Sequence, residues 1–107
     1  MDTEHNPEFF YLTTVGRKSG QLREIEIWYV PLAGSYYLIA ENGHNADWVK
    51  NLQANPHVAF WVEGKLHKGA ARIVDAAQET KLHEAVCALF HDKYEWNEGV
   101  VVEVRAL

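Results

Sequence analysis

Apolar residues occur along this chain mainly in short runs or in alternation with polar ones, which is the pattern of β-strands. The clearest alternation lies in 23–30, where Ile25 and Ile27 share one face and Glu24 and Glu26 the other. Turn residues over 31–35 predict a hairpin that brings the next strand beside this one. The pattern therefore predicts six strands, over 8–14, 23–30, 36–40, 58–62, 66–74 and 99–104.

Two segments repeat apolar residues every three or four positions, as amphipathic helices do. The first contains Trp48 and Leu52, begins after a candidate cap at Asn45 and stops before Pro56. The second follows a candidate cap at Asp75 and has an apolar stripe of Leu82, Val86, Leu89 and Phe90. Strands and helices in this order predict a mostly β fold, a small antiparallel barrel with two helices over its openings.

Three smaller features refine this expectation. Residues 1–7 are polar and are expected to form a short arm. Gly69, inside a predicted strand, indicates a bulge or a close approach of another backbone. In the last strand Val100, Val102 and Val104 share one face, with Glu103 and Arg105 opposite.

The composition is that of one folded domain over 1–107, with 48% apolar and 23% charged residues. The net charge of −5 argues against general nucleic-acid binding. A single cysteine, Cys87, allows no internal disulfide and fits a reducing compartment. No signal-peptide pattern and no run of 18 apolar residues is found, so no membrane span is predicted and the cytoplasm is the expected location.

The stretch 13–23 is a turn with two glycines and three cations between two apolar runs. Gly16 and Gly20 allow the chain to curl so that successive N–H groups face an anion. The side chains able to hold a phosphate there are Arg17, Lys18, Ser19 and Arg23. A plain basic surface turn is the commoner meaning of such a stretch, and both interpretations stay open on these residues alone.

Side-chain catalysts are scarce. Neither serine lies in a Gly-x-Ser-x-Gly elbow, and Cys87 falls in the amphipathic helix, where burial is expected. The six histidines show no metal-site spacing, so no metal is predicted, and no catalytic residue is assigned. A cationic turn with abundant aromatic residues instead favours an enzyme whose chemistry belongs to a bound cofactor.

Two motifs carry a family resemblance. Residues 12–23 (LTTVGRKSGQLR), followed by 48–56 (WVKNLQANP), resemble the deazaflavin-dependent nitroreductases, also described as coenzyme F420-dependent quinone reductases. The resemblance implies a split β-barrel of the FMN-binding type, related to pyridoxamine-phosphate oxidases, and hydride transfer from a reduced deazaflavin. It places the 16–23 turn at the phosphate-bearing tail of the cofactor, and Trp48, Asn51 and Leu52 on the helix that borders its site.

The chain departs from the family pattern after the third strand. Typical members carry Ser-Lys-Gly-Gly where this chain has Glu41, Asn42, Gly43 and His44, so a neutral amide at Asn42 replaces a phosphate-binding lysine. Trp28, with Tyr29 beside it, stands where a tyrosine often lies near the substrate. Trp28, Tyr29 and Tyr94 are therefore expected to line the substrate side.

The predicted function is an F420-dependent oxidoreductase that passes a hydride to a small acceptor such as a quinone or nitro compound. Because the acidic chain suits a polyanionic tail poorly, FMN is the alternative cofactor. A non-catalytic module that carries a flavin, haem or lipid-like ligand is the second hypothesis, and an interaction scaffold the third. Small split barrels often complete their pockets with a partner subunit, so a homodimer is expected.

Overall fold

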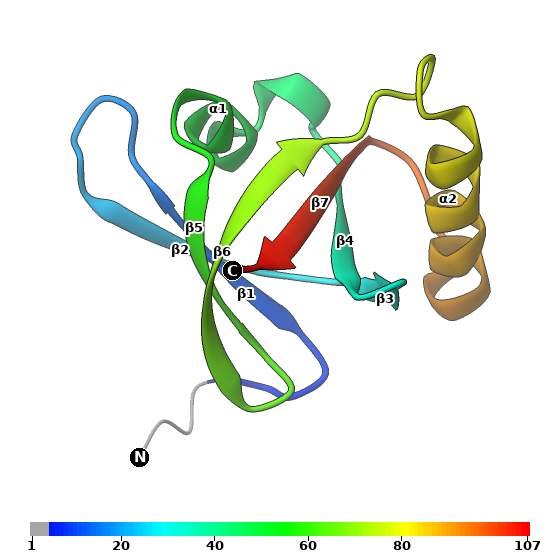
Figure 1. Cartoon of the computed structure of the whole chain (residues 1–107), viewed down its shortest axis with the longest axis horizontal. Helices are drawn as coiled ribbons and strands as arrows, with labels where there is room; N and C mark the ends of the chain where they lie inside the picture. The colour runs from blue at the N-terminus through cyan, green and yellow to red at the C-terminus, as the bar shows by residue number, and fades with distance from the viewer. Residues whose placement is uncertain (1–4) are drawn as a thin grey trace.

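The computed structural model describes residues 5–107, in which seven strands form one antiparallel sheet. The sheet curls into a half-barrel, with α1 over one opening and α2 against its outer face (Figure 1). The strand order is β2-β1-β5-β6-β7-β4-β3. The strands are β1 (Phe10–Val15), β2 (Leu22–Ile27), β3 (Val30–Leu32), β4 (Ser35–Ala40), β5 (His57–Val62), β6 (Lys65–Ile73) and β7 (Val100–Ala106).

The prediction of six strands is wrong by one, because the predicted strand over 23–30 is two strands. β2 pairs with β1, with Ile27 opposite Phe10, whereas β3 pairs with β4, with Val30 opposite Tyr37. The predicted hairpin therefore joins only β3 to β4, and β2 and β3 stand at opposite ends of the strand order.

The break falls at Trp28 and Tyr29, and Tyr94 explains it. The Tyr94 hydroxyl donates to the carbonyl oxygen of Tyr29 at 2.9 Å and accepts from its N–H at 3.3 Å. Both main-chain groups of Tyr29 are thus bonded to a side chain rather than to a neighbouring strand. Buried peptide groups need hydrogen-bond partners, and these two hydrogen bonds supply them. The chain can therefore leave one edge of the sheet and join the other.

Strand β7 lies inside the sheet, where it pairs with β6 on one side and β4 on the other. Val102 and Val104 face the core inside the half-barrel, and Val101 faces a second core beneath α2. Fully buried side chains of the inner core include Phe10, Leu12, Leu38 and Phe60.

Glu103 lies on the face of β7 opposite Val102, as predicted, but this face is covered and the side chain is buried. Its carboxylate accepts from the Tyr37 hydroxyl at 2.7 Å and from Arg72 Nε at 3.0 Å. Burial, followed by the hydrogen bond to Glu103, raises the pKa of Tyr37 to about 12. The buried carboxylate is therefore paired on both of its oxygens, as buried charges must be.

The helices are α1 (Asp47–Ala54), which follows a short 3-10 turn η1 (Gly43–Asn45), and α2 (Thr80–Tyr94). Asn45 does not cap α1, because the cap residue is Ala46 and no side chain bonds there. Asp75 accepts from the amides of residues 77 and 78, so it stabilises a turn before α2 rather than the helix itself. The apolar stripe of α2 is confirmed, with Val86 and Phe90 fully buried.

Of the two features predicted at Gly69, a bulge or a close approach of another backbone, the close approach is confirmed. A Cβ placed on this residue would lie 2.2 Å from the carbonyl oxygen of Arg105 on β7. Only glycine therefore lets β6 and β7 come this close.

Part of the predicted arm over 1–7 packs on the fold, while residues 1–4 lie outside the described residues. The His5 ring stacks on Trp61, with centroids 5.1 Å apart, and its Nε2 lies 3.1 Å from Glu24 Oε2.

Candidate cofactor and substrate site

The β1–β2 turn is closed by its own backbone. The Gly16 N–H donates to the Gln21 carbonyl oxygen, and the Gly20 N–H donates to the Gly16 carbonyl oxygen, both at 2.8 Å. Gly20 has φ +72°, and a Cβ on Gly16 would lie 2.8 Å from Ser19 Oγ. Gly20 is thus favoured by its left-handed backbone, and a side chain at position 16 would displace the Ser19 hydroxyl.

This closure leaves anion-binding groups at the tip. Within residues 5–107, the amides of Lys18 and Ser19 donate to no protein acceptor, and the Lys18 and Arg23 side chains make no ion pair. Two neighbouring N–H groups with an ammonium and a guanidinium are a donor set suited to one phosphate group. The turn therefore fits the phosphate of a flavin or deazaflavin cofactor.

Asn51 of α1 locks the turn in place. Its Oδ1 accepts from the Arg17 backbone N–H at 3.2 Å and from Arg17 Nη1 at 2.8 Å. Its Nδ2 donates to Thr14 Oγ1 of β1 at 3.4 Å. Because Asn51 is only 4% exposed, it holds turn, strand and helix together from a buried position.

Arg17 is partly committed to this contact and is not a free phosphate ligand. Its Nη2 lies 3.4 Å from Asp47 Oδ1, whose side chain is 85% exposed. An exposed ion pair of this length is worth little, so a phosphate could replace Asp47 at small cost.

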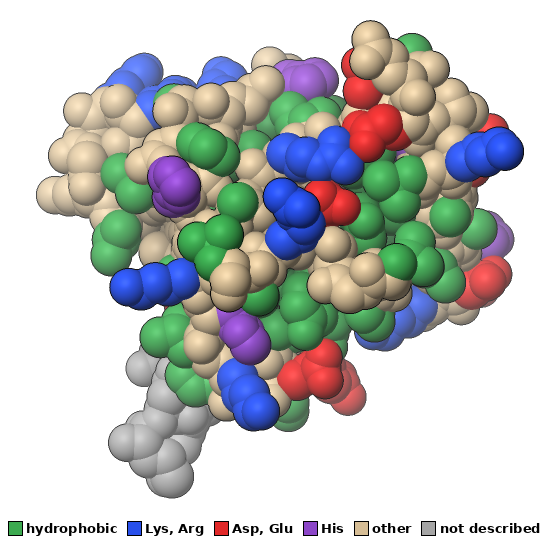
Figure 2. Space-filling view, in the orientation of Figure 1, with side chains coloured by type: hydrophobic (Ala, Val, Ile, Leu, Met, Phe, Trp, Pro, Cys, Tyr) green, Lys and Arg blue, Asp and Glu red, His purple; other side chains and the backbone are tan. Residues whose placement is uncertain are grey.

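A cavity of about 530 Å³ lies between this turn and α1. Its walls carry the cations Arg17, Lys18 and Arg23 and the carboxylates of Glu24 and Asp47. Figure 2 shows Lys and Arg side chains at the upper left, over the hairpin and α1, while basic and acidic side chains are interspersed elsewhere on this face. In this view no acidic side chain of the described residues lies among the Lys and Arg side chains over the hairpin.

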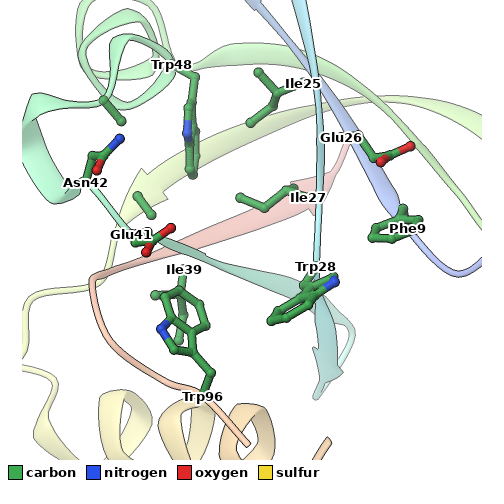
Figure 3. Close-up of a pocket in the computed structure, with 12 residues that line it drawn as sticks. Phe9, Ile25, Glu26, Ile27, Trp28, Ile39, Glu41, Asn42, Trp48 and Trp96 are labelled. Atoms are coloured by element: carbon green, nitrogen blue, oxygen red, sulfur yellow. The ribbon is translucent and has the colours of Figure 1, made fainter. Parts of the chain in front are cut away.

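A second cavity, of about 640 Å³, lies on the open side of the half-barrel between β2 and β4. In Figure 3, Ile25 and Ile27 point from β2 toward Trp48, which projects from α1, and Ile39 and Trp96 lie below them. Ile25 and Trp48 line both cavities, so the cationic cavity adjoins the apolar one.

Trp28 forms a fixed aromatic wall of the second cavity. Its ring stacks on Tyr94 with centroids 4.5 Å apart and an interplanar angle of 1°, and Trp96 meets it edge-on at 6.1 Å. Trp28 is nevertheless 40% exposed. A flat ring entering the cavity therefore meets a large aromatic surface whose orientation is already set.

The structure gathers most of the predicted site residues around these two cavities. The residues that line the cationic cavity are Gly16, Arg17, Lys18, Ser19, Arg23, Trp48 and Asn51. Trp28, Asn42 and Trp48 line the apolar one.

Four predicted residues line neither cavity. Gly20 shapes the turn, Leu52 and Tyr29 are buried in the core, and Tyr94 lies behind Trp28. In this geometry they support the walls, and their direct contact with a ligand stays a prediction.

Sequence reasoning missed Phe9, Ile39 and Trp96 as lining residues. Phe9 and Ile39 lie in predicted strands, where nothing distinguishes them from core residues. Trp96 follows α2, and its only signal was the high tryptophan content of the chain.

The comparison with protein families identifies the family of the chain. Residues 3–104 match the family described as F420H(2)-dependent quinone reductase. The chain belongs to this family. Family membership confirms the predicted resemblance and, at the level of the family, coenzyme F420 as the cofactor. No curated protein matches the chain significantly.

Solved structures of similar fold include an F420-H2 dependent reductase, FDR-A, at 23% identity and a TM-score of 0.62, covering 91% of this chain and 92% of that one. A putative pyridoxamine 5'-phosphate oxidase from Listeria innocua has 14% identity and a TM-score of 0.72, and the match covers 92% of this chain and 83% of that one. A structure described as a domain-swapped dimer has 22% identity and a TM-score of 0.64, and the match covers 94% of this chain and 81% of that one. These similarities confirm the split-barrel fold.

Two further observations concern the described part of the chain, residues 5–107. Its helices are all too short or too polar to cross a membrane. It also contains no cluster of three or more histidine, cysteine, aspartate or glutamate side chains placed to hold a metal ion.

Proposed function

We propose that this protein is an F420H2-dependent reductase that passes a hydride to a small electron-poor acceptor such as a quinone or nitro compound. The observation that carries the proposal is the junction of the two cavities at Ile25 and Trp48. A cationic cavity that adjoins an apolar aromatic one matches a cofactor with a phosphate at one end and a flat ring at the other.

Each part of the chain has a role in this proposal. Lys18 and Arg23 bind the phosphate, and Asn51 holds the turn at the required distance from α1. Trp48 separates the phosphate end from the ring end, and Trp28 orients the acceptor. The cofactor, when bound, supplies the hydride; the protein positions the two reactants and keeps the ring out of bulk water.

FMN is the second candidate cofactor, and charge is the reason. The three cations of the turn face Glu24 and Asp47, so the cavity neutralises a single phosphate better than a long polyanionic tail. FMN carries only a phosphate, whereas F420 adds an oligoglutamate tail. The family match places F420 first.

The test is a titration of the purified protein with F420 and with FMN, each at low and high salt. The proposal expects tight F420 binding that weakens with salt, as counter-ion competition at an exposed cationic site requires. FMN affinity at least tenfold higher than F420 affinity, about 1.4 kcal/mol, would make FMN the cofactor. Binding of neither would remove the proposal, and an absorbance spectrum of the purified protein would reveal a haem or another chromophore.

Lys18→Ala tests the turn directly. Loss of a charged hydrogen-bond donor to phosphate should weaken F420 binding by roughly 1.5–3 kcal/mol without changing stability, because Lys18 makes no contact that supports the fold. Lys81→Ala is the matched control, since it removes the same charge from the exposed surface of α2. Equal affinities of the two variants would show that the phosphate binds elsewhere.

The predicted homodimer remains part of this proposal. β2 and β3 end the strand order of the described sheet, so each has an outer edge without a neighbouring strand, and a second copy could cover such an edge. The domain-swapped dimer among the structural neighbours supports this arrangement. Light scattering that shows a monomer at micromolar concentration with cofactor bound would exclude it. The cytoplasmic location and the single domain over 1–107 also stay predictions.

A further inference from the structure

The apolar cavity has a charge asymmetry that its aromatic walls do not explain. The carboxylate of Glu41 lines it, and no lysine, arginine or histidine of the described residues does. The cations of the site all belong to the adjoining cavity, where the phosphate of a cofactor would neutralise them. An acceptor in the apolar cavity therefore meets the negative charge of Glu41 and no positive charge from the described residues.

Glu26 of β2 also borders the cavity, but in Figure 3 its side chain points away from it, on the face of β2 opposite Ile25 and Ile27. Its carboxylate accepts from the Tyr11 hydroxyl at 2.6 Å. Glu41 directly follows β4 and makes no hydrogen bond or ion pair within the described residues 5–107. In Figure 3, Glu41 lies across the cavity from β2, beside Asn42 and above Trp96. Its charge is exposed and free to act on whatever enters.

We infer that Glu41 is a specificity-determining residue that selects acceptors by charge. Uncharged or positively charged flat acceptors are admitted, and acceptors bearing a carboxylate or sulfonate are rejected. The aromatic wall of Trp28 provides the affinity for a flat ring, and Glu41 adds the discrimination against anions. This inference deepens the proposed function and rests on it for the identity of the site.

Coulomb's law sets the size of the effect. A unit charge about 4 Å from a carboxylate in water changes affinity roughly fivefold, or about 1 kcal/mol. Replacing the carboxylate by an ammonium changes the sign of the interaction, so roughly a 25-fold change in discrimination is expected between the two. Added salt should reduce both values, because the site is open to solvent.

The experiment uses 1,4-naphthoquinone, its 2-sulfonate and a trimethylammonium derivative as probes. Their binding is measured on the cofactor-free protein by calorimetry, and their kcat/KM as acceptors is measured on the protein loaded with F420H2. In turnover F420H2 gives a hydride, which carries both electrons, to the quinone and releases one proton to solvent. The hydroquinone anion takes up one proton, and the cofactor leaves as F420. Probes differ in reactivity, so each is compared between wild type and variant, where this difference cancels.

The variants are Glu41→Gln and Glu41→Lys, with Glu84→Gln and Glu84→Lys as controls that change net charge equally from the exposed face of α2. Glu41→Gln should improve sulfonate binding roughly fivefold, and Glu41→Lys roughly 25-fold. Both substitutions should weaken binding of the cationic probe. The Glu84 variants should bind each of the three probes with an affinity within about twofold of the wild-type value. Since Glu41 is exposed, its variants should fold, and circular dichroism checks this.

Two results would overturn the inference: an affinity of Glu41→Lys for the sulfonate equal to that of wild type, or equal effects of the Glu41 and Glu84 substitutions. Failure of F420 to bind would instead overturn the proposed function. The calorimetric arm needs no cofactor, so it still decides whether Glu41 selects by charge.

Discussion

Asn51→Ala should detach the β1–β2 turn from α1. The substitution removes the acceptor of two donors of Arg17, its backbone N–H and its Nη1. A neutral hydrogen bond contributes about 0.5–1.5 kcal/mol and one to a charged group about 1.5–3. Because the Arg17 side chain is 24% exposed, water replaces part of the lost bonding, and we expect a loss of about 2 kcal/mol in the free energy of unfolding.

This loss is measurable in two ways. For a domain of this size it lowers the melting temperature by roughly 8 °C, which a circular dichroism melt resolves. Amide hydrogen exchange should accelerate at Arg17, because its N–H no longer has a buried acceptor. Binding of F420 should weaken as well, since the anion-binding amides are no longer held against α1.

Two variants make the experiment decisive. Gln53→Ala truncates an exposed amide on the same helix and should change stability by less than about 0.5 kcal/mol. Asn51→Asp keeps the acceptor for Arg17, loses the donor to Thr14 and adds a negative charge to the cationic cavity, so it should be more stable than Asn51→Ala but lose anion affinity. If Asn51→Ala were as stable as Gln53→Ala, with unchanged exchange at Arg17, Asn51 would not be the residue that locks the turn.

Two further predictions concern the sheet. Because the pKa of Tyr37 is raised from 10.0 to about 12 in the folded state, its contribution to stability is present below pH 10 and is lost as pH rises through 12. Tyr37→Phe should remove this pH dependence and cost about 1–3 kcal/mol at pH 7, since Glu103 loses a partner; an identical alkaline unfolding profile would contradict this. Gly69→Ala should destabilise the fold by about 1–3 kcal/mol, because its Cβ would overlap the Arg105 carbonyl oxygen. A melting temperature equal to that of wild type would show that β6 and β7 separate without cost.

The sequence was sufficient to predict the structure of segments whose conformation is determined by residues close together in the chain. The turn at 16–21 lies between two strands that pair directly with each other, so its glycines and cations were sufficient to predict a turn that lines the cationic cavity. The stripe of α2 followed from its spacing alone. In contrast, Asn51 entered only through the family resemblance, because its bond to Arg17 joins residues 34 positions apart.

The predictions were wrong where residues far apart in the sequence determine the local structure. Trp28, Tyr29 and Val30 form an apolar β-prone run, and only the hydroxyl of Tyr94, 65 residues away, ends the strand within it. Glu103 alternates with valines as a surface residue would, yet Tyr37 and Arg72 come from two other strands to pair it. Trp96 reaches the cavity because α2 returns the chain to the open side of the half-barrel. No local pattern contains this information.

The position of β7 between β6 and β4 has a consequence for synthesis. This strand is made after all the others, yet it joins the β2-β1-β5-β6 half of the sheet to the β4-β3 half. On the ribosome the earlier strands therefore emerge as two separate groups, each with an unpaired edge where β7 will insert. The nascent chain has to be kept from aggregating through these edges until residues 100–106 leave the exit tunnel.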